Sequence, residues 1–156
     1  MKIGLLLDKK NDWLLLYLSK KDFKQISNIK ITIGHDISRM NNHDVIFLLG
    51  YTKKITRKDL LRNKLNLVIH ESDLPQDRGF SPIQHQILNG KNNLKVSLII
   101  ANVELDKGSI LLKRDLKFEG TELYDEIREK QAKITKSIIY EFIKNYPEIL
   151  DNKIKQ

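Results

Sequence analysis

The chain has 156 residues, the length of one domain, and is long enough to bury a hydrophobic core of its own. Cysteine is absent, which excludes disulfides, thiolate zinc sites and a cysteine nucleophile and suits the reducing cytoplasm. The net charge of +8 would attract anions, but the lysines are scattered and aromatic residues make up only 7%, which disfavours nucleic-acid binding as a main function. No apolar run approaches the ~18 residues of a membrane span, so we expect a cytoplasmic protein without membrane contact.

Short apolar runs alternate with helical patterns through the first half of the chain. The predicted strands cover residues 2–7, 29–33, 44–50 and 67–69. A turn over residues 8–12 leads into a helix, and another short helix ends within residues 60–65. The apolar face of the first helix contains Trp13, Leu14, Tyr17, Leu18 and Phe23. Because parallel neighbours need crossover connections, this alternation predicts a parallel α/β sheet.

The second half begins with a helix that has clear start and stop signals. Ser81 and Pro82 provide an N-cap and first-turn pair, and Asn89-Gly90 ends the helix after Leu88. Two strands over residues 96–100 and 109–112 follow, joined by a turn. They predict an antiparallel extension of the sheet near residues 95–113.

The last element has the clearest helical pattern of the chain. It begins from an N-cap at Thr121 and ends at Asn145-Tyr146-Pro147. Its apolar stripe contains Leu123, Ile127, Ile134, Ile138 and Phe142. Residues 1–150 therefore form a single domain, and residues 151–156 are expected to be a disordered tail.

Two residues have the types and positions of an acid/base pair. His70 closes the strand over residues 67–69, and ligands of open α/β sheets bind at the carboxyl ends of strands. Asp106 lies thirty-six residues later in the turn Leu-Asp-Lys-Gly. Each residue alone has an ordinary structural interpretation, as a strand-end histidine or a turn acid. Together, and with a rigid loop containing Pro75 and Gly79 between them, they predict a site for proton transfer.

The other polar candidates are weaker. His35, His43 and His85 are not spaced with carboxylates as metal ligands are, so we predict no metal site. Ser72 beside His70 would suit a hydrolase nucleophile, but the Gly-x-Ser-x-Gly elbow of such enzymes is absent.

The sequence around both candidates resembles the folate-dependent formyltransferases. The matching residues are His70-Glu71-Ser72-Asp73-Leu74-Pro75, Arg78-Gly79, Pro82, Gly90 and Asp106-Lys107-Gly108-Ser109-Ile110. They lie in the family's order and spacing over roughly residues 44–112. The resemblance agrees with a Rossmann-like fold, a mostly parallel twisted sheet flanked by helices, and makes residues 1–150 a formyltransferase-like catalytic domain.

The resemblance also implies a reaction and a site. An amine would attack the formyl carbon of 10-formyltetrahydrofolate, with His70 and Asp106 as the catalytic pair and with Ser72 or Arg78 supporting the oxyanion or the substrate. No metal is implied. The folate would lie against Leu49, Gly50, Tyr51, Thr52, Ile55, Asn102, Val103, Glu104 and Leu105.

One departure from the family pattern affects the chemistry. The family has Asn two residues before the histidine, but this position is Val68, which has no hydrogen-bond donor. Asn66 lies about 13 Å from His70 along the strand, at ~3.3 Å per residue, and cannot replace it. Loss of one such donor costs ~3 kcal/mol, so Ser72, a backbone N–H or water replaces it, or the activity is weakened.

The resemblance leaves several acceptors open. The first loop offers Lys9, Lys10 and Asn11 to a substrate in place of a Gly-rich phosphate cradle, and the Ser-Asp-Leu-Pro loop is similar to that of enzymes that formylate nucleotide-linked amino sugars for surface polysaccharides. We therefore expect a nucleotide-linked amino sugar. The alternatives are glycinamide ribonucleotide, initiator methionyl-tRNA, whose enzymes usually have a further C-terminal domain, and a catalytically weakened folate- or nucleotide-binding module. The oligomeric state stays open, with a homodimer as one alternative.

Overall fold

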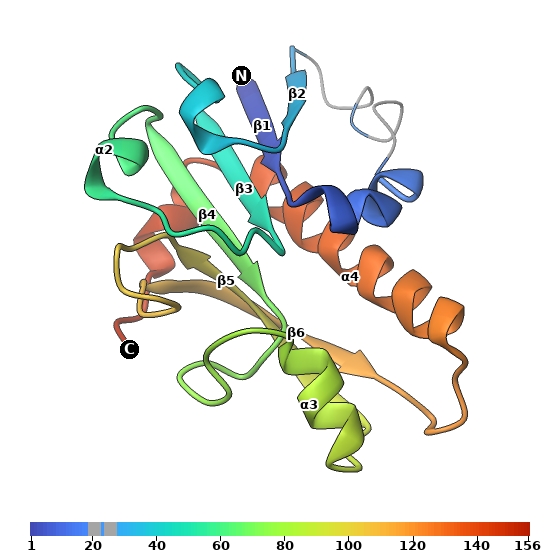
Figure 1. The fold of residues 1–156 in the computed structure, drawn as a ribbon. Helices are drawn as coiled ribbons and strands as arrows, with labels where there is room; N and C mark the ends of the chain where they lie inside the picture. The colour runs from blue at the N-terminus through green and yellow to red at the C-terminus, as the bar shows by residue number, and fades with distance from the viewer. Residues whose placement is uncertain (19–22, 24–27) are drawn as a thin grey trace.

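The computed structural model describes residues 1–18, 23 and 28–156, and it contains one six-stranded sheet in the order β2-β1-β3-β4-β5-β6 (Figure 1). The strands are β1 Lys2–Leu6, β2 Lys30–Gly34, β3 Val45–Leu49, β4 Leu65–His70, β5 Asn93–Ile100 and β6 Ile110–Lys117. The first four strands are parallel, whereas β5 and β6 pair antiparallel. The predicted α/β fold, with its antiparallel extension, is confirmed.

The central strands follow directly from their apolar sequences. All five residues of β3 are buried, because β1 and β4 flank the strand and elements cover both of its faces. The antiparallel strands extend beyond the predicted segments, to Asn93 and Lys117. The parts of β5 and β6 beyond the predicted segments contain both polar and apolar residues. The apolar runs in the sequence therefore predicted only the buried part of each strand.

Short helices connect the strands, and one long helix covers the sheet. They are η1 Lys9–Leu16, η2 Ile37–Arg39, α2 Arg57–Leu60, α3 Pro82–Leu88, α4 Tyr124–Lys144 and η3 Glu148–Asn152, where η marks a 3-10 helix. The helix predicted to end within 60–65 ends at Leu60, and the capping box formed by Thr56 and Asp59 fixes its start.

The structure differs from the predictions around the first helix. The 3-10 helix η1 starts inside the segment predicted as a turn, and the Asn11 side chain donates to the Gly50 carbonyl at 2.7 Å, which ties this segment to the end of β3. The rest of the helix predicted through Phe23 falls partly on residues 19–22, outside the described residues.

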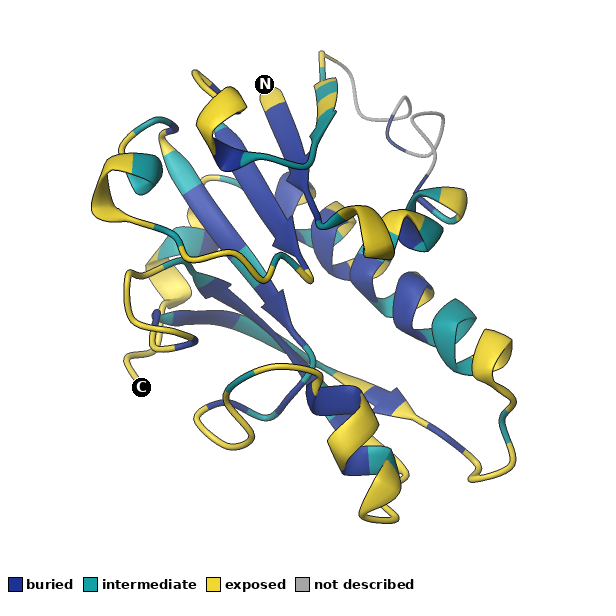
Figure 2. Ribbon diagram, viewed as in Figure 1, coloured by how far each residue is buried: buried dark blue, intermediate teal, exposed yellow. Residues whose placement is uncertain are grey.

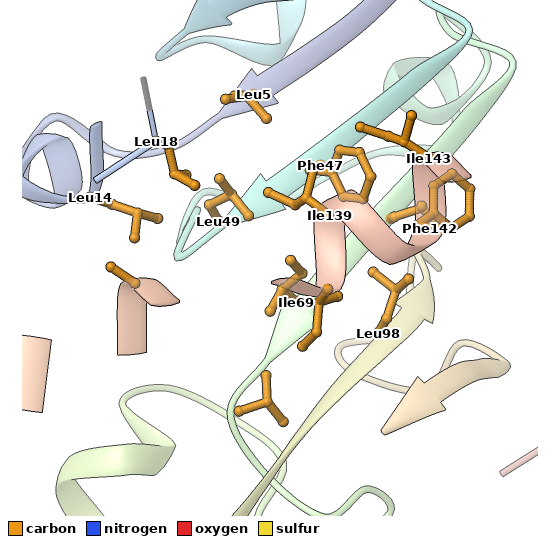
Figure 3. Close-up of a cluster of buried hydrophobic side chains, with 14 of the residues drawn as sticks. Leu5, Leu14, Leu18, Phe47, Leu49, Ile69, Leu98, Ile139, Phe142 and Ile143 are labelled. Atoms are coloured by element: carbon orange, nitrogen blue, oxygen red, sulfur yellow. The ribbon is translucent and has the colours of Figure 1, made fainter. Parts of the chain in front are cut away.

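Helix α4 packs its apolar stripe across one face of the sheet. Ile138, Ile139 and Phe142 are fully buried, and the rings of Phe142 and Phe47 lie edge to face at 5.5 Å (Figures 2 and 3). The helix begins after the predicted N-cap Thr121. Leu123 is 73% exposed and is the N-cap residue, whose N–H donates to the Glu126 carboxylate, so it does not belong to the stripe.

The segment predicted to be a disordered tail pairs with the sheet. Ile154 forms an isolated bridge with Ile110, with two backbone hydrogen bonds of 2.8 and 2.9 Å. The Gln156 amide donates to the carbonyl oxygens of Asp106 and Gly108. The expectation of disorder is therefore corrected: the edge strand β6 offers unpaired backbone groups, which a short polar segment can satisfy.

The Glu122 carboxylate makes the stability of the segment before α4 dependent on pH. The hydrogen bond from Lys130 and those from the N–H groups of Glu119 and Gly120 lower the pKa of Glu122 from 4.5 to about 2. A group whose pKa is lower in the folded state stabilises the fold above its unfolded pKa and loses that contribution as the pH falls. We expect wild type to melt higher than Glu122→Gln near neutrality and the two melting temperatures, measured by circular dichroism, to converge between pH 4.5 and about 2. A difference that is the same at all pH values would contradict this assignment.

Candidate active site

His70 ends β4 and lies in the wall of a cleft. Its side chain is on the same strand face as Val68 and is 7% exposed. The ring Nε2 lies 3.0 Å from the carbonyl oxygen of Asp77. Because a carbonyl oxygen only accepts, Nε2 carries a hydrogen in this arrangement, and Nδ1 is left for other partners.

Asp106 approaches His70 from the loop between β5 and β6. One carboxylate oxygen, Oδ1, lies 3.6 Å from His70 Nδ1, and the other, Oδ2, accepts the N–H of Gly79 at 3.0 Å. The residue has a φ of +53°, which aspartate tolerates better than most residues. The structure thus brings together the two candidates that the sequence placed thirty-six residues apart.

Gly108 allows the Asp106 loop to reach this position. A Cβ atom at Gly108 would lie 1.5 Å from the carbonyl oxygen of Ile100. Only glycine therefore permits the loop to pass so close to the end of β5. The glycine of the Asp-Lys-Gly turn has a steric role that its sequence position did not reveal.

The loop after His70 is held in place by buried hydrogen bonds. The Ser72 hydroxyl donates to the Gln76 carbonyl at 2.8 Å, and Ser97 donates to the Ser72 carbonyl at 2.7 Å. Lys113 of β6 donates to the Asp73 carboxylate and to the Leu74 carbonyl. Ser72 is fully buried and does not line the cleft, so in this structure its side chain stabilises the loop and has no access to a substrate.

The cleft has a volume of about 390 Å³ and opens at the carboxyl ends of the parallel strands. It contains both candidate catalytic residues and most of the predicted folate contacts. Those predicted contacts are Gly50, Tyr51, Thr52, Ile55, Asn102, Val103 and Leu105. Leu49 and Glu104 do not line it, because Leu49 belongs to the core and the Glu104 carboxylate pairs with Lys107 at 2.6 Å.

Several cleft residues were missed from the sequence. Phe80, Ser81 and Pro82 form one wall, and Phe80 is 59% exposed, which is unusual for a phenylalanine. The sequence Arg-Gly-Phe-Ser-Pro could have indicated this wall. A phenylalanine flanked by turn residues lies in a surface loop, where its side chain is not buried in the hydrophobic core. Glu71 also lines the cleft and was noted only as part of the motif.

The segment after β3 is fixed by its own polar contacts. The Thr52 hydroxyl and N–H both donate to the Asp8 carboxylate, and Lys53 donates to the His35 carbonyl. The Tyr51 hydroxyl accepts the Ile37 N–H at 3.4 Å, and burial raises the pKa of this phenol above 10.0. This wall of the cleft is therefore formed before any ligand binds.

Val68 faces the cleft between apolar neighbours. Like Tyr51, Ile55 and Ala101, it packs against the buried cluster that contains Ile46 and Leu48, and it provides no donor where the family motif has an amide. Asn66 does not compensate, because its Nδ2 donates to the Leu60 carbonyl and the residue does not line the cleft.

The remaining candidates lie outside the cleft. Lys9 and Lys10 are exposed and Arg78 donates to Gln156, so none of the three lines it. Within residues 1–18, 23 and 28–156, no cluster of three or more histidine and carboxylate side chains is arranged to hold a metal ion. Among the residues that the structure describes, no helix is long and apolar enough to cross a membrane.

Comparison with known proteins places this site in a family. A family model described as formyl transferase matches residues 2–143. The chain belongs to the formyl transferase family. A methionyl-tRNA formyltransferase from Mycoplasmopsis pulmonis is 31% identical over 142 residues, which is 87% of this chain and 49% of that protein. The chain spans about half or less of the length of the curated relatives it matches.

Solved structures of formyl transferase family members share the fold. The methionyl-tRNA formyltransferase from Clostridium thermocellum aligns with all of this chain and 67% of its own, with a TM-score of 0.77 and 26% identity. The formyltransferase PseJ from Anoxybacillus kamchatkensis, solved with UDP-4,6-dideoxy-4-formamido-L-AltNAc and tetrahydrofolate, aligns with all of this chain and 80% of its own. Its TM-score is 0.62 at 22% identity, which is a likeness of fold.

Proposed function

We propose that this protein transfers a formyl group from 10-formyltetrahydrofolate to a primary amine, with His70 and Asp106 as the catalytic pair. One observation carries the proposal: in a chain of the formyl transferase family, an imidazole and a carboxylate lie 3.6 Å apart in the wall of a cleft at the carboxyl ends of parallel strands.

Each residue has a defined part in this reaction. The amine nitrogen attacks the formyl carbon and gives a tetrahedral intermediate, and the bond from that carbon to N10 of the folate then breaks. Asp106 takes the proton that the amine loses, directly or through water, and this proton then passes to N10 as the bond to the formyl carbon breaks. His70, held at Nε2 by the Asp77 carbonyl, stabilises the oxyanion through a protonated Nδ1.

The cleft walls suit the folate donor. A volume of about 390 Å³ falls within the usual size range of small-molecule sites, and the lining is mostly apolar. Tyr51 and Ile55 form one side, and the loop with Asn102 and Val103 forms another. Backbone groups of these two segments would recognise the pterin ring.

We propose a nucleotide-linked amino sugar as the acceptor, because the Ser-Asp-Leu-Pro form of the loop after His70 is similar to that of sugar-modifying members of the family. Methionyl-tRNA is the second candidate. It is favoured by relatives at about 30% identity whose names specify that substrate, and by the net charge of +8.

A single assay separates these acceptors. The protein is incubated with 10-formyltetrahydrofolate and, separately, with UDP-4-amino-4,6-dideoxy-L-AltNAc, glycinamide ribonucleotide or methionyl-tRNA, and release of tetrahydrofolate is followed. Turnover with the sugar nucleotide supports the proposal, and turnover with methionyl-tRNA alone assigns the second candidate. Tight binding of the folate without turnover on any amine would indicate a binding module that has lost its chemistry.

The cleft predicts a gain of activity for Val68→Asn. An amide at this position would add an oxyanion donor that the wild-type side chain lacks, and such a donor contributes about 10²- to 10³-fold to kcat. We expect kcat to rise at least about tenfold, since part of this contribution is already supplied by backbone or water. Val68→Thr, of nearly the same volume, is the control for added polarity. An unchanged or lower kcat in Val68→Asn with intact folate binding would show that another donor already occupies the site.

A further inference from the structure

We infer that Glu71 binds the amino group of the acceptor and thereby positions it for attack; this rests on the proposed function. Glu71 follows His70 directly and lines the cleft. It also lines a small adjoining hollow of about 30 Å³ between η1 and α4. Gly50, Ile69 and Glu71 line both cavities, so Glu71 lies at their boundary. The hollow has room for one small polar group, such as an ammonium.

A chain of hydrogen bonds fixes the Glu71 carboxylate. The Gln131 amide nitrogen donates to Glu71 Oε1 at 2.6 Å, and Arg128 donates to the Gln131 amide oxygen at 2.9 Å. The second bond sets the orientation of the amide, so that its NH₂ group faces Glu71. Arg128 is itself held between the rings of Trp13 and Tyr124, at 4.5 and 5.0 Å. The carboxylate is therefore positioned in advance from α4, which a substrate-binding group requires.

This carboxylate has no cationic partner in the described part of the chain. Glu71 is half-buried and Gln131 engages only Oε1, which leaves Oε2 for another donor. A partly desolvated carboxylate is stabilised by a positive charge or N–H donor. In the proposed reaction the acceptor is a primary amine, which is mostly protonated near neutral pH before it reacts. Its N–H groups are the complementary partner of this carboxylate. Glu71 lines both the hollow and the cleft that contains His70 and Asp106.

A second group in the hollow fits an acceptor with an oxygen near its amine. Trp13 lines the hollow, and its buried Nε1–H has no hydrogen-bond partner. An amino sugar carries a hydroxyl next to its amine, and such an oxygen would accept this hydrogen bond. Asn11 and Thr135 are further polar residues in a lining that also contains Leu14, Leu49 and Ile69.

The test is Glu71→Gln, which keeps the size of the side chain and removes its charge. With the acceptor identified by the assay above, we expect the KM for the acceptor to rise about 10- to 100-fold, as for loss of a hydrogen bond to a charged group, while the KM for 10-formyltetrahydrofolate stays within about twofold. Glu71→Asp should recover part of the loss. Glu148→Gln, the same substitution at an exposed carboxylate of η3, is the matched control and should leave both constants unchanged.

An acceptor analogue with a hydroxyl in place of the amine separates amine binding from a structural role. Its inhibition constant should be nearly equal for wild type and Glu71→Gln, because it lacks the ammonium that Glu71 binds. A lower melting temperature with both KM values raised together would assign Glu71 to the packing of α4 and overturn the inference. If Glu71→Gln is active and its KM for the acceptor equals that of wild type, the inference is overturned as well. If wild type formylates no amine, the proposed function itself fails.

Discussion

Replacing His70 with alanine is expected to lower kcat for formyl transfer about 10³-fold, within the range for loss of a group that stabilises an oxyanion. Asp106→Asn should have a similar effect, because it keeps the shape of the carboxylate but cannot take a proton. Since the two side chains lie 3.6 Å apart and act on the same tetrahedral intermediate, the double variant should be little slower than either single variant. Single-turnover formation of the formylated product measures the chemical step directly.

Controls for this prediction address folding. His70 is buried, so His70→Gln, which preserves more volume, accompanies the alanine variant. His85→Ala, at an exposed position of α3, should retain full activity. Binding of a folate analogue should survive in both His70 variants. If His70→Gln folds and keeps more than about a tenth of wild-type kcat, the assignment of His70 to stabilisation of the oxyanion is wrong.

Replacing Gly108 with alanine is expected to destabilise the protein by about 3 kcal/mol and to displace Asp106, the proposed proton acceptor. The new Cβ would lie 1.5 Å from the Ile100 carbonyl oxygen, a backbone atom that cannot move without disturbing β5. Because Asp106 is two residues away in the same loop, a shift of about 1 Å at its carboxylate should lower kcat about 10²-fold. Denaturant unfolding gives the first quantity and steady-state kinetics the second.

The matched control is Gly90→Ala. Gly90 has a φ of +72°, but no atom lies near the position of an added Cβ. This substitution should therefore cost only about 1 kcal/mol of backbone strain and leave kcat unchanged. If Gly108→Ala were no more destabilising than Gly90→Ala, the close approach of the loop to β5 would not be a determinant of the site.

Apolar runs were sufficient to predict the central strands and the long helix. Val45–Leu49 is short and apolar throughout, which favours a strand buried on both faces, and the four-residue spacing of Ile138 and Phe142 favours the apolar face of a helix. The residue types around His70 and Asp106 also predicted a site. These features depend on local pattern, which the sequence contains in full.

Other features depended on contacts between distant segments. Ser72 stands beside His70 in the sequence, but its hydroxyl is turned into the loop toward Gln76. Leu123 has the spacing of the α4 stripe, but it lies before the helix begins and stays exposed. The polar segment 151–156 has no pattern of its own, yet it pairs with the free edge of β6. The local pattern of a segment contains no information on which backbone groups of a distant strand are left unpaired, so this pairing could not be predicted.

For this protein, the sequence by itself determined the α/β sheet and singled out His70 and Asp106 as candidates, because burial patterns and residue chemistry are properties of the residues. Only the tertiary structure decided that the two side chains meet at 3.6 Å and that Gly108 permits this meeting. It also decided that Glu71 is oriented by Gln131 of α4, sixty residues later in the chain. Such arrangements arise when separate segments pack against one sheet, and the distances between them are set by the whole fold.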